Sequence, residues 1–168
     1  MNTLIKYVVT DPCYILSDDK WDECCKFLDD SPKAFNEAVS KALTDLSGFP
    51  AFACDTGFGD WSNKIYGSYI IHKEFSADSG MVSVCCLTPE IEKHFAKEYS
   101  DIYSHCAAVF EGSEDISVDF DISEPSWTVV KIYDNKTGNF IETMNADDFY
   151  AESEDFDDDY SDDEEEEY

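Results

Sequence analysis

The last 22 residues limit most strongly what this chain can fold into. Of the 39 acidic residues in the 168-residue sequence, 14 lie in residues 147–168, and this segment contains no basic residue. Such a segment cannot bury enough apolar area to offset the entropy of ordering it, and its charges repel one another. We therefore expect residues 1–146 to form a single domain and residues 147–168 to be a disordered acidic tail.

The rest of the chain has the composition of a folded protein. The whole sequence is 43% hydrophobic and includes 12 Phe, 10 Tyr and 3 Trp residues, which suffices for a packed core. No stretch approaches the roughly 18 uncharged apolar residues that span a bilayer. Asp11 and Pro12 stand where a signal peptide would keep its apolar stretch. We expect a cytoplasmic protein.

The overall charge restricts the kind of partner. The formal net charge is −28, and the 11 basic residues are all lysines. Arginine is the preferred residue for bidentate contacts with phosphate and guanine, so its absence argues against direct binding to nucleic acid or to an anionic membrane. We expect a basic protein as the partner, because opposite charges attract over long distances. The oligomeric state is left open.

The cysteines indicate a reducing compartment. Their number, seven, is odd, and four of them form the adjacent pairs Cys24-Cys25 and Cys85-Cys86, which are awkward for ordinary disulfides. No two cysteines have the CxxC spacing, and the three histidines are not at zinc-ligand spacing from them. We expect neither a structural zinc site nor a cofactor.

Two capped helices are expected after the first strand. Residues 4–10 alternate and are rich in β-branched residues, which predicts a strand. Ser17 can cap one helix, and Ser31-Pro32 begins another that Gly48 ends. The apolar face of the first helix contains Trp21, Cys24, Cys25 and Leu28. The apolar stripe of the second contains Phe35, Ala38, Val39, Ala42, Leu43 and Leu46.

The remaining pattern predicts mostly strands. A third helix is expected from Thr88-Pro89 to Glu98, and the segment 56–67 is expected to be a glycine-bearing connection. Strands are expected at 50–55, 68–75, 81–87, 105–111, 116–122, 126–133 and 139–144. This order predicts an α+β fold, in which three helices cover one face of a mostly antiparallel sheet of about six to eight strands.

Three short segments resemble parts of a known group of proteins. They are TDPCY at 10–14, TGFGDW at 56–61 and ADSGM at 77–81. Together they resemble a group of small uncharacterised proteins of phages and prophages, over roughly residues 7–87. The resemblance implies a shared domain of viral or mobile-element origin, in which case the compartment is the cytosol of the host cell. It implies no activity, and the acidic tail lies outside it.

Three aspartates in these segments are candidates for a metal site. Asp11, Asp60 and Asp78 are each expected at a strand end beside Gly or Pro, where they can converge on one rim of a sheet. Such carboxylates suit Mg²⁺ or Ca²⁺, which prefer oxygen ligands. In the alternative that we favour, each aspartate closes its own turn by accepting hydrogen bonds from nearby backbone N–H groups.

Cys13 is a candidate nucleophile. His72, His94 or His105 can serve as its base, because a Cys–His pair needs only proximity in space. Cysteine is also among the most frequently buried residue types, and His94 falls on the apolar face of its expected helix. We favour a packing role for both residues.

The tail is a candidate binding segment. If extended, it carries roughly one charge per 5 Å, against one per 3.4 Å along a DNA strand. Aromatic residues interrupt the acids, a composition typical of interaction segments. An EF-hand-like spacing of acids is discarded, because Tyr160 stands where the loop requires glycine. The expected partner-binding residues are Asp155, Phe156, Asp157, Asp158, Asp159, Tyr160, Asp162, Asp163, Glu164 and Glu165.

Three functions fit these observations. The first is a phage-type acidic protein that binds and inhibits a basic, nucleic-acid-binding host defence protein, partly by mimicking nucleic acid. The second is a non-enzymatic accessory or scaffold protein whose tail maintains solubility. The third is a small hydrolase that depends on a divalent metal at Asp11, Asp60 and Asp78.

Overall fold

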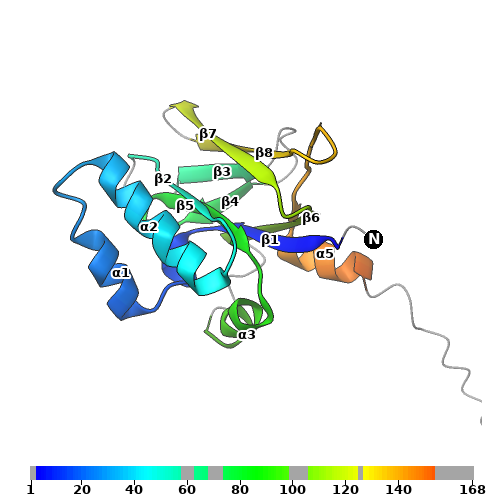
Figure 1. Cartoon of the computed structure of the whole chain (residues 1–168), viewed down its shortest axis with the longest axis horizontal. Helices are drawn as coiled ribbons and strands as arrows, with labels where there is room; N and C mark the ends of the chain where they lie inside the picture. Colours follow the sequence, from blue (N-terminus) through cyan, green and yellow to red (C-terminus); the bar gives the residue numbers. More distant parts are fainter. Residues whose placement is uncertain (1–2, 58–62, 68–73, 99–105, 125–126, 154–168) are drawn as a thin grey trace, which may run out of the picture.

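The computed structural model describes residues 3–57, 63–67, 74–98, 106–124 and 127–153 (Figure 1). The helices are α1 (Asp18–Cys25), α2 (Pro32–Ser47), α3 (Pro89–Glu98) and α5 (Ala146–Ser153), and a 3-10 turn, η1, spans Pro12–Tyr14. The strands are β1 (Ile5–Thr10), β2 (Phe52–Asp55), β3 (Asn63–Gly67), β4 (Glu74–Ala77), β5 (Met81–Cys86), β6 (Ala107–Gly112), β7 (Ile116–Glu124), β8 (Trp127–Asp134), β9 (Asn139–Phe140) and β10 (Met144–Asn145). None of these described helices combines the length and the apolar composition that crossing a bilayer requires.

The strands form two sheets. The central sheet has the order β10-β6-β1-β5-β2, and each neighbouring pair in it is antiparallel. The outer sheet has the order β4-β3-β8-β7, with β9 paired to β8. Its pairs are antiparallel except that β3 runs parallel to β8. The α+β class and the mostly antiparallel pairing are therefore confirmed, with the strands divided between two sheets.

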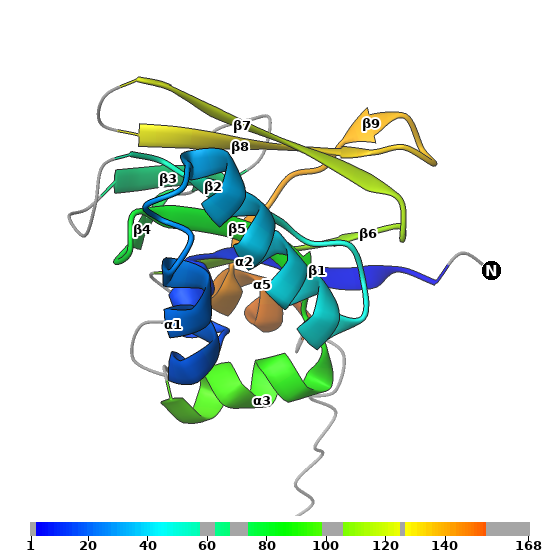
Figure 2. The same cartoon turned by 60° about the vertical axis from the view of Figure 1, so that its left-hand side comes forward.

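The central sheet is buried on both faces. Val8 of β1 belongs to the core beneath the helices, whereas Tyr7 and Val9 belong to the core between the two sheets. All six residues of β5 are buried. Figure 2 shows the resulting layers, with the outer sheet on one side of the central sheet and the helices on the other. The helices cover one face as expected, and the outer sheet covers the face that the sequence interpretation left open.

Helix α2 begins and ends as its sequence predicts. The Ser31 hydroxyl accepts a hydrogen bond from the N–H of Ala34 (3.0 Å), Pro32 occupies the first turn, and Gly48 ends the helix with a φ of 76°. Most of the expected stripe faces the core, but Leu46 is 42% exposed. Helix α1 is also capped as expected, by Ser17, but it ends at Cys25, which leaves Leu28 beyond the helix and 51% exposed.

Side chains of α2 protect the edge of the central sheet. Three polar residues of this helix, spaced four apart, accept hydrogen bonds from backbone N–H groups of β2 and of the residue before it: Asn36 from Asp55 (2.7 Å), Ser40 from Ala53 (3.0 Å) and Thr44 from Ala51 (3.0 Å). Unpaired N–H groups at a sheet edge are a template for unwanted strand pairing. One face of α2 therefore takes the place of a neighbouring strand.

Three strands differ from the sequence interpretation. Strand β3 lies inside the segment 56–67 that was expected to be a connection. Of the strand expected at 68–75, residues 68–73 lie outside the described residues, and Glu74 and Phe75 belong to β4. The strand expected at 139–144 is divided into β9, in the outer sheet, and β10, in the central sheet. The chain changes sheets within this segment, which a hydropathy pattern cannot show.

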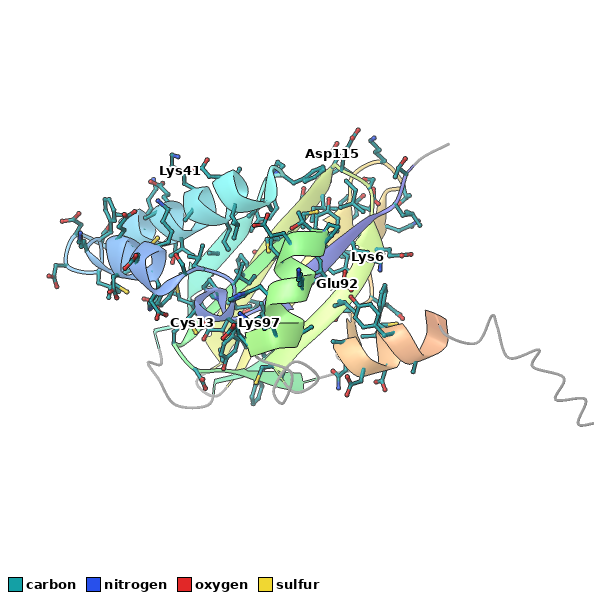
Figure 3. The ribbon with its side chains drawn as sticks, turned by 90° about the horizontal axis from the view of Figure 1, so that it is seen from below. Lys6, Cys13, Lys41, Glu92, Lys97 and Asp115 are labelled. Atoms are coloured by element: carbon teal, nitrogen blue, oxygen red, sulfur yellow. The ribbon has the colours of Figure 1, made fainter. Side chains whose placement is uncertain are left out.

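Helix α5 corrects the expected start of the tail. Residues 147–153 are helical rather than disordered, because this part of the acidic segment contains a pair of aromatic residues that dock on the domain. Phe149 packs against the core beneath the helices, and the Tyr150 hydroxyl donates a hydrogen bond to Glu92 of α3 (2.5 Å). The Lys6 ammonium lies 5.9 and 5.3 Å from the centres of the Phe149 and Tyr150 rings. Figure 3 shows Lys6 and Glu92 on the side of the domain where α3 and α5 lie.

Candidate functional site

Asp11 joins the end of β1 to a distant turn. Its buried carboxylate accepts hydrogen bonds from the backbone N–H of Cys13 (2.9 Å) and from the backbone N–H (2.6 Å) and hydroxyl (2.7 Å) of Ser79. The bond from Cys13 closes the local turn, and the bonds from Ser79 tie that turn to the connection between β4 and β5. Both carboxylate oxygens are thereby engaged in holding the fold.

Described residues of the three segments TDPCY, TGFGDW and ADSGM meet at this end of the central sheet. Thr56, from the second segment, donates both its backbone N–H (3.0 Å) and its hydroxyl (2.5 Å) to the carbonyl of Gly80 in the third. Gly80 has a φ of 73°, a left-handed conformation that favours glycine. Sequence reasoning selected the aspartates in these segments but missed Ser79 and Thr56, since a serine or threonine beside a turn carries no signal for a partner so far along the chain.

The other two aspartates of the expected metal site are Asp78 and Asp60. Asp78 is exposed, and its hydrogen bond with the Tyr14 hydroxyl adds to burial in raising the pKa of Tyr14. Asp60 lies outside the described residues. Within the described part of the chain, no group of three or more His, Cys, Asp or Glu side chains is arranged to hold a metal ion.

The surroundings of Cys13 oppose its activation as a nucleophile. Burial raises the pKa of its thiol, and the negative charges of Asp11 and Asp78 raise it further. A nucleophilic cysteine needs the reverse, a pKa lowered by a positive neighbour. His94 lies on α3, where it lines the cavity described next, and His72 and His105 lie outside the described residues. All seven cysteines are free thiols in the structure.

A cavity lies between the three helices α1, α2 and α3. Its volume is about 580 Å³, within the range of roughly 300–1,000 Å³ that is typical of ligand sites. Apolar side chains supply much of its wall: Ile15, Leu16, Ala42, Leu46 and Ile91. The remaining lining residues are Ser17, Asp19, Lys20, Glu23, Asp45, Glu90 and His94.

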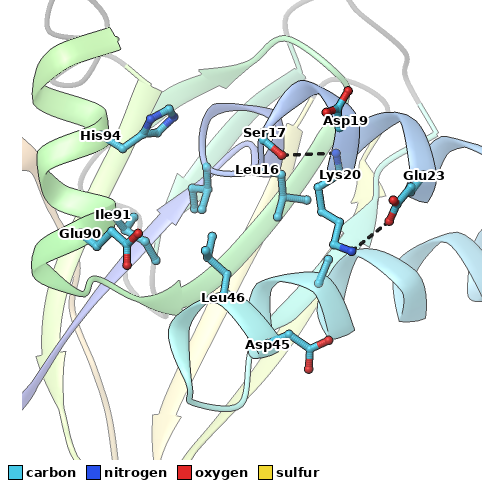
Figure 4. Close-up of a pocket in the computed structure, with 12 residues that line it drawn as sticks. Leu16, Ser17, Asp19, Lys20, Glu23, Asp45, Leu46, Glu90, Ile91 and His94 are labelled. Carbon is cyan, nitrogen blue, oxygen red and sulfur yellow. Dashed lines mark hydrogen bonds and ion pairs between the residues drawn. The ribbon is translucent and has the colours of Figure 1, made fainter.

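Carboxylates surround the apolar wall of this cavity. Figure 4 shows Leu16 and Leu46 near the middle and Ile91 beside Glu90 on α3, with the other acidic side chains on the α1 and α2 sides: Asp19, Glu23 and Asp45. Lys20 is the lysine in the lining, and its ammonium lies 2.9 Å from Glu23. This hydrogen bond lowers the pKa of Glu23 and raises that of Lys20, so both stay charged at neutral pH. The charge around the cavity is thus predominantly negative.

A smaller hollow adjoins the cavity along α1 and α2. Its volume is about 170 Å³, and it shares four lining residues with the cavity: Lys20, Glu23, Ala42 and Asp45. Its other walls are Cys24, Phe27, Ala38 and Lys41. We call the cavity and this hollow together the helical groove. Leu46, which lines the cavity, and Phe27, which lines the hollow, are 42% and 43% exposed.

The acidic residues expected to bind a partner belong to the C-terminal tail. All of the expected partner-binding positions lie in residues 154–168, outside the described part of the chain. Comparisons with protein-family models, with curated proteins and with solved structures find no match to this chain. The chemistry of the described surface is therefore the basis for assigning a function.

Proposed function

We propose that this chain is a non-enzymatic binding protein whose partner is a basic protein, and that the partner is a nucleic-acid-binding host protein, which it inhibits. The observation that carries the proposal is the distribution of carboxylates. Among the described acids, Asp11 and Asp134 are the buried ones, and both accept hydrogen bonds from neighbouring groups. The other described acids whose exposure is defined lie at least partly on the surface.

The lysines do little to offset this surface charge. Among the lysines in the described part of the chain, six form ion pairs with nearby acids: Lys20, Lys33, Lys41, Lys97, Lys131 and Lys136. A seventh, Lys6, lies against the aromatic rings of α5. A phosphate-binding surface needs cationic groups that are not already engaged with carboxylates. The surface therefore favours a cationic partner over a nucleic acid.

Two features support a partner that normally binds nucleic acid. If extended, residues 154–168, which contain 11 acids, carry roughly one charge per 5 Å, within a factor of two of a DNA strand, so they can place carboxylates where phosphates would bind. The resemblance of residues 7–87 to phage proteins supports a host protein as the target. The metal-dependent hydrolase alternative has less support, because both carboxylate oxygens of Asp11 already accept hydrogen bonds from Cys13 and Ser79.

Competition with DNA tests this proposal. The tagged full chain is used to capture proteins from a host lysate, and each captured protein is then purified and bound to a fluorescent DNA. We expect the captured protein to be basic and the chain to displace the DNA from it. Raising the salt concentration from about 0.05 to 0.3 M should weaken the chain's own affinity for the protein by about tenfold or more. An acidic partner, or a basic partner that binds the chain and DNA at the same time, would contradict the proposal.

A further inference from the structure

We infer that the helical groove is the docking site for a basic amphipathic helix of the partner protein. This inference rests on the proposed function and assigns the contact to one face of the domain. The groove offers an apolar wall at the surface of a strongly charged protein, where Leu46 and Phe27 each leave more than two fifths of their surface exposed. Exposed apolar surface that is rimmed by polar residues is typical of interaction sites.

The groove has two adjoining parts that lie along α1 and α2. The cavity and the smaller hollow share four lining residues, Ala42 among them, so a ligand laid along the groove can place an apolar side chain in each. A helix in a groove presents such anchors at positions i, i+3 or i+4, and i+7. The groove is itself built between helices, with α1 and α2 forming its length and α3 closing one end.

The rim determines the charge of the ligand. Four carboxylates and one lysine line the cavity, and that lysine is already bound to Glu23. Lysine or arginine side chains that flank the apolar anchors can approach Asp19 and Glu90, whereas Asp45 is already ion-paired with Lys41 of the smaller hollow (2.5 Å). Complementary charge of this kind increases the rate of association and fixes the orientation of the partner.

The same charge excludes other occupants. The acidic tail of this chain is repelled by the rim, since it contains no base between Asp147 and its end. A second copy of the chain carries the same net charge of −28 and would meet the rim with like charge. Phosphorylated ligands and anionic lipid surfaces are excluded for the same reason.

Two pairs of matched variants test the inference. Leu46→Ser removes an apolar wall of the groove, and its control, Ile122→Ser, changes a residue of nearly equal exposure on β7 (42% and 41%). The double variant Asp19→Asn/Glu90→Gln removes two charges from the rim. Its control, Glu111→Gln/Asp119→Asn, removes two exposed charges from β6 and β7. Thermal melts of each full-length variant verify that the fold is retained.

The probe is an 18-residue helical peptide of leucine and lysine with its leucines on one face, used beside the captured partner. We expect each groove variant to weaken binding of both ligands by about fivefold or more and each control to change it by less than about twofold. A peptide with glutamate in place of lysine should not bind. In NMR titrations, shifts should be largest at Leu16, Leu46 and Ile91.

The outcomes separate the two claims. If the partner binds and displaces DNA while the groove variants behave like their controls, the groove is not the docking site and the proposed function stands. If neither the lysine peptide nor any basic protein binds the full chain, the proposed function fails and the groove assignment fails with it. Equal binding of the lysine and glutamate peptides would also overturn the assignment, because the rim would then have no role in selection.

Discussion

Asp11 and Asp134 each hold a distant turn in place through a buried carboxylate. Each is buried, and each accepts hydrogen bonds from both the backbone N–H and the hydroxyl of a serine in a distant turn, Ser79 for Asp11 and Ser113 for Asp134. A buried carboxylate is tolerated only when its oxygens are satisfied in this way. In a protein with 39 acids, these two hold turns together while the others are left for the surface.

The pKa of Asp134 predicts a specific pH dependence. Burial acts to raise this pKa, but hydrogen bonds from Ser113 and from the backbone N–H groups of Lys136 and Thr137 outweigh it and hold the pKa below its ordinary value. A lowered folded-state pKa gives stability that is present above the unfolded pKa of about 4 and is lost as the pH falls through the folded value. At pH 7, Asp134→Asn should therefore lower the free energy of unfolding by about 1–3 kcal/mol.

Urea unfolding of wild type and Asp134→Asn at pH 7, 5 and 3.5 checks this expectation. The difference between the two proteins should be constant from pH 7 to 5 and should shrink below about pH 4. The exposed variant Asp119→Asn serves as the control and should change stability by less than about 0.5 kcal/mol at each pH. A difference for Asp134→Asn that is the same at all three pH values would show that the charge of this carboxylate is not what stabilises the fold.

Among the elements, α2 combines core packing with edge protection. Ser40 accepts a hydrogen bond from the N–H of Ala53 and donates one to the carbonyl of Asn36. Ser40→Ala leaves the Ala53 N–H without its acceptor, and the better helix propensity of alanine offsets only part of this cost. We expect a net loss of about 1 kcal/mol in the free energy of unfolding, measured in urea.

A second alanine variant on α2 is the control for Ser40. Glu37 lies on the exposed face of the helix, where its ion pair with Lys33 has an N–O distance of 3.9 Å. Glu37→Ala should change stability by less than about 0.5 kcal/mol. Equal effects of the two substitutions would mean that the bond to β2 contributes no more than a solvent-exposed ion pair.

Helix α5 belongs to the domain rather than to the tail. A chain that ends after Ser153 should unfold as cooperatively as the full chain, because the packing of Phe149 and the bond from Tyr150 to Glu92 remain. A chain that ends after Asn145 loses both, and its free energy of unfolding should fall by about 2–4 kcal/mol. Calorimetry of the two truncated chains measures the difference. Equal melting temperatures for the two truncated chains would show that α5 does not stabilise the domain.

The sequence predicts best those elements whose ends are set by residues within or directly beside the element. The start and end of α2 follow from Ser31, Pro32 and Gly48, whose effects act within one turn of the chain. No local signal shows that some of the strands belong to a second, outer sheet, because that sheet pairs β3 in parallel with β8, which is distant in the sequence. The nearly continuous apolar run of β5, whose six residues are all buried, is typical of a sheet that is covered on both faces. The sequence interpretation used this run only to predict a strand.

The groove could not be predicted, for a related reason. Its walls come from three helices, and no local pattern shows which side chains meet across them. Leu46 continues the apolar stripe of α2 by its spacing, so the sequence places it in the core, whereas it forms the wall of a surface cavity. The cluster around Asp11 was predicted in part, since the turn residues Asp11 and Gly80 carry local signals and Ser79 does not.

At the scale of the whole molecule, 39 acids against 11 lysines make the chain strongly negative. Residues 154–168 contain 11 of the 39 acids, so the chain ending after Ser153 still has 28 acids against 11 lysines. The helical groove lies in the helical layer, and its rim has the same sign of charge as the tail. The groove has in addition an apolar wall that includes Leu16, Leu46 and Ile91.

The most direct test of carboxylate-driven capture is the association rate constant of the chain with its captured basic partner, measured at several salt concentrations. The full chain and the chain ending after Ser153 are compared. We expect the rate constant of the full chain to fall by about tenfold or more between about 0.05 and 0.3 M salt, because exposed charges are screened within about 8 Å at physiological ionic strength. We expect a smaller but measurable fall for the truncated chain. An association rate that is independent of salt for both chains would show that carboxylate charge does not drive the capture.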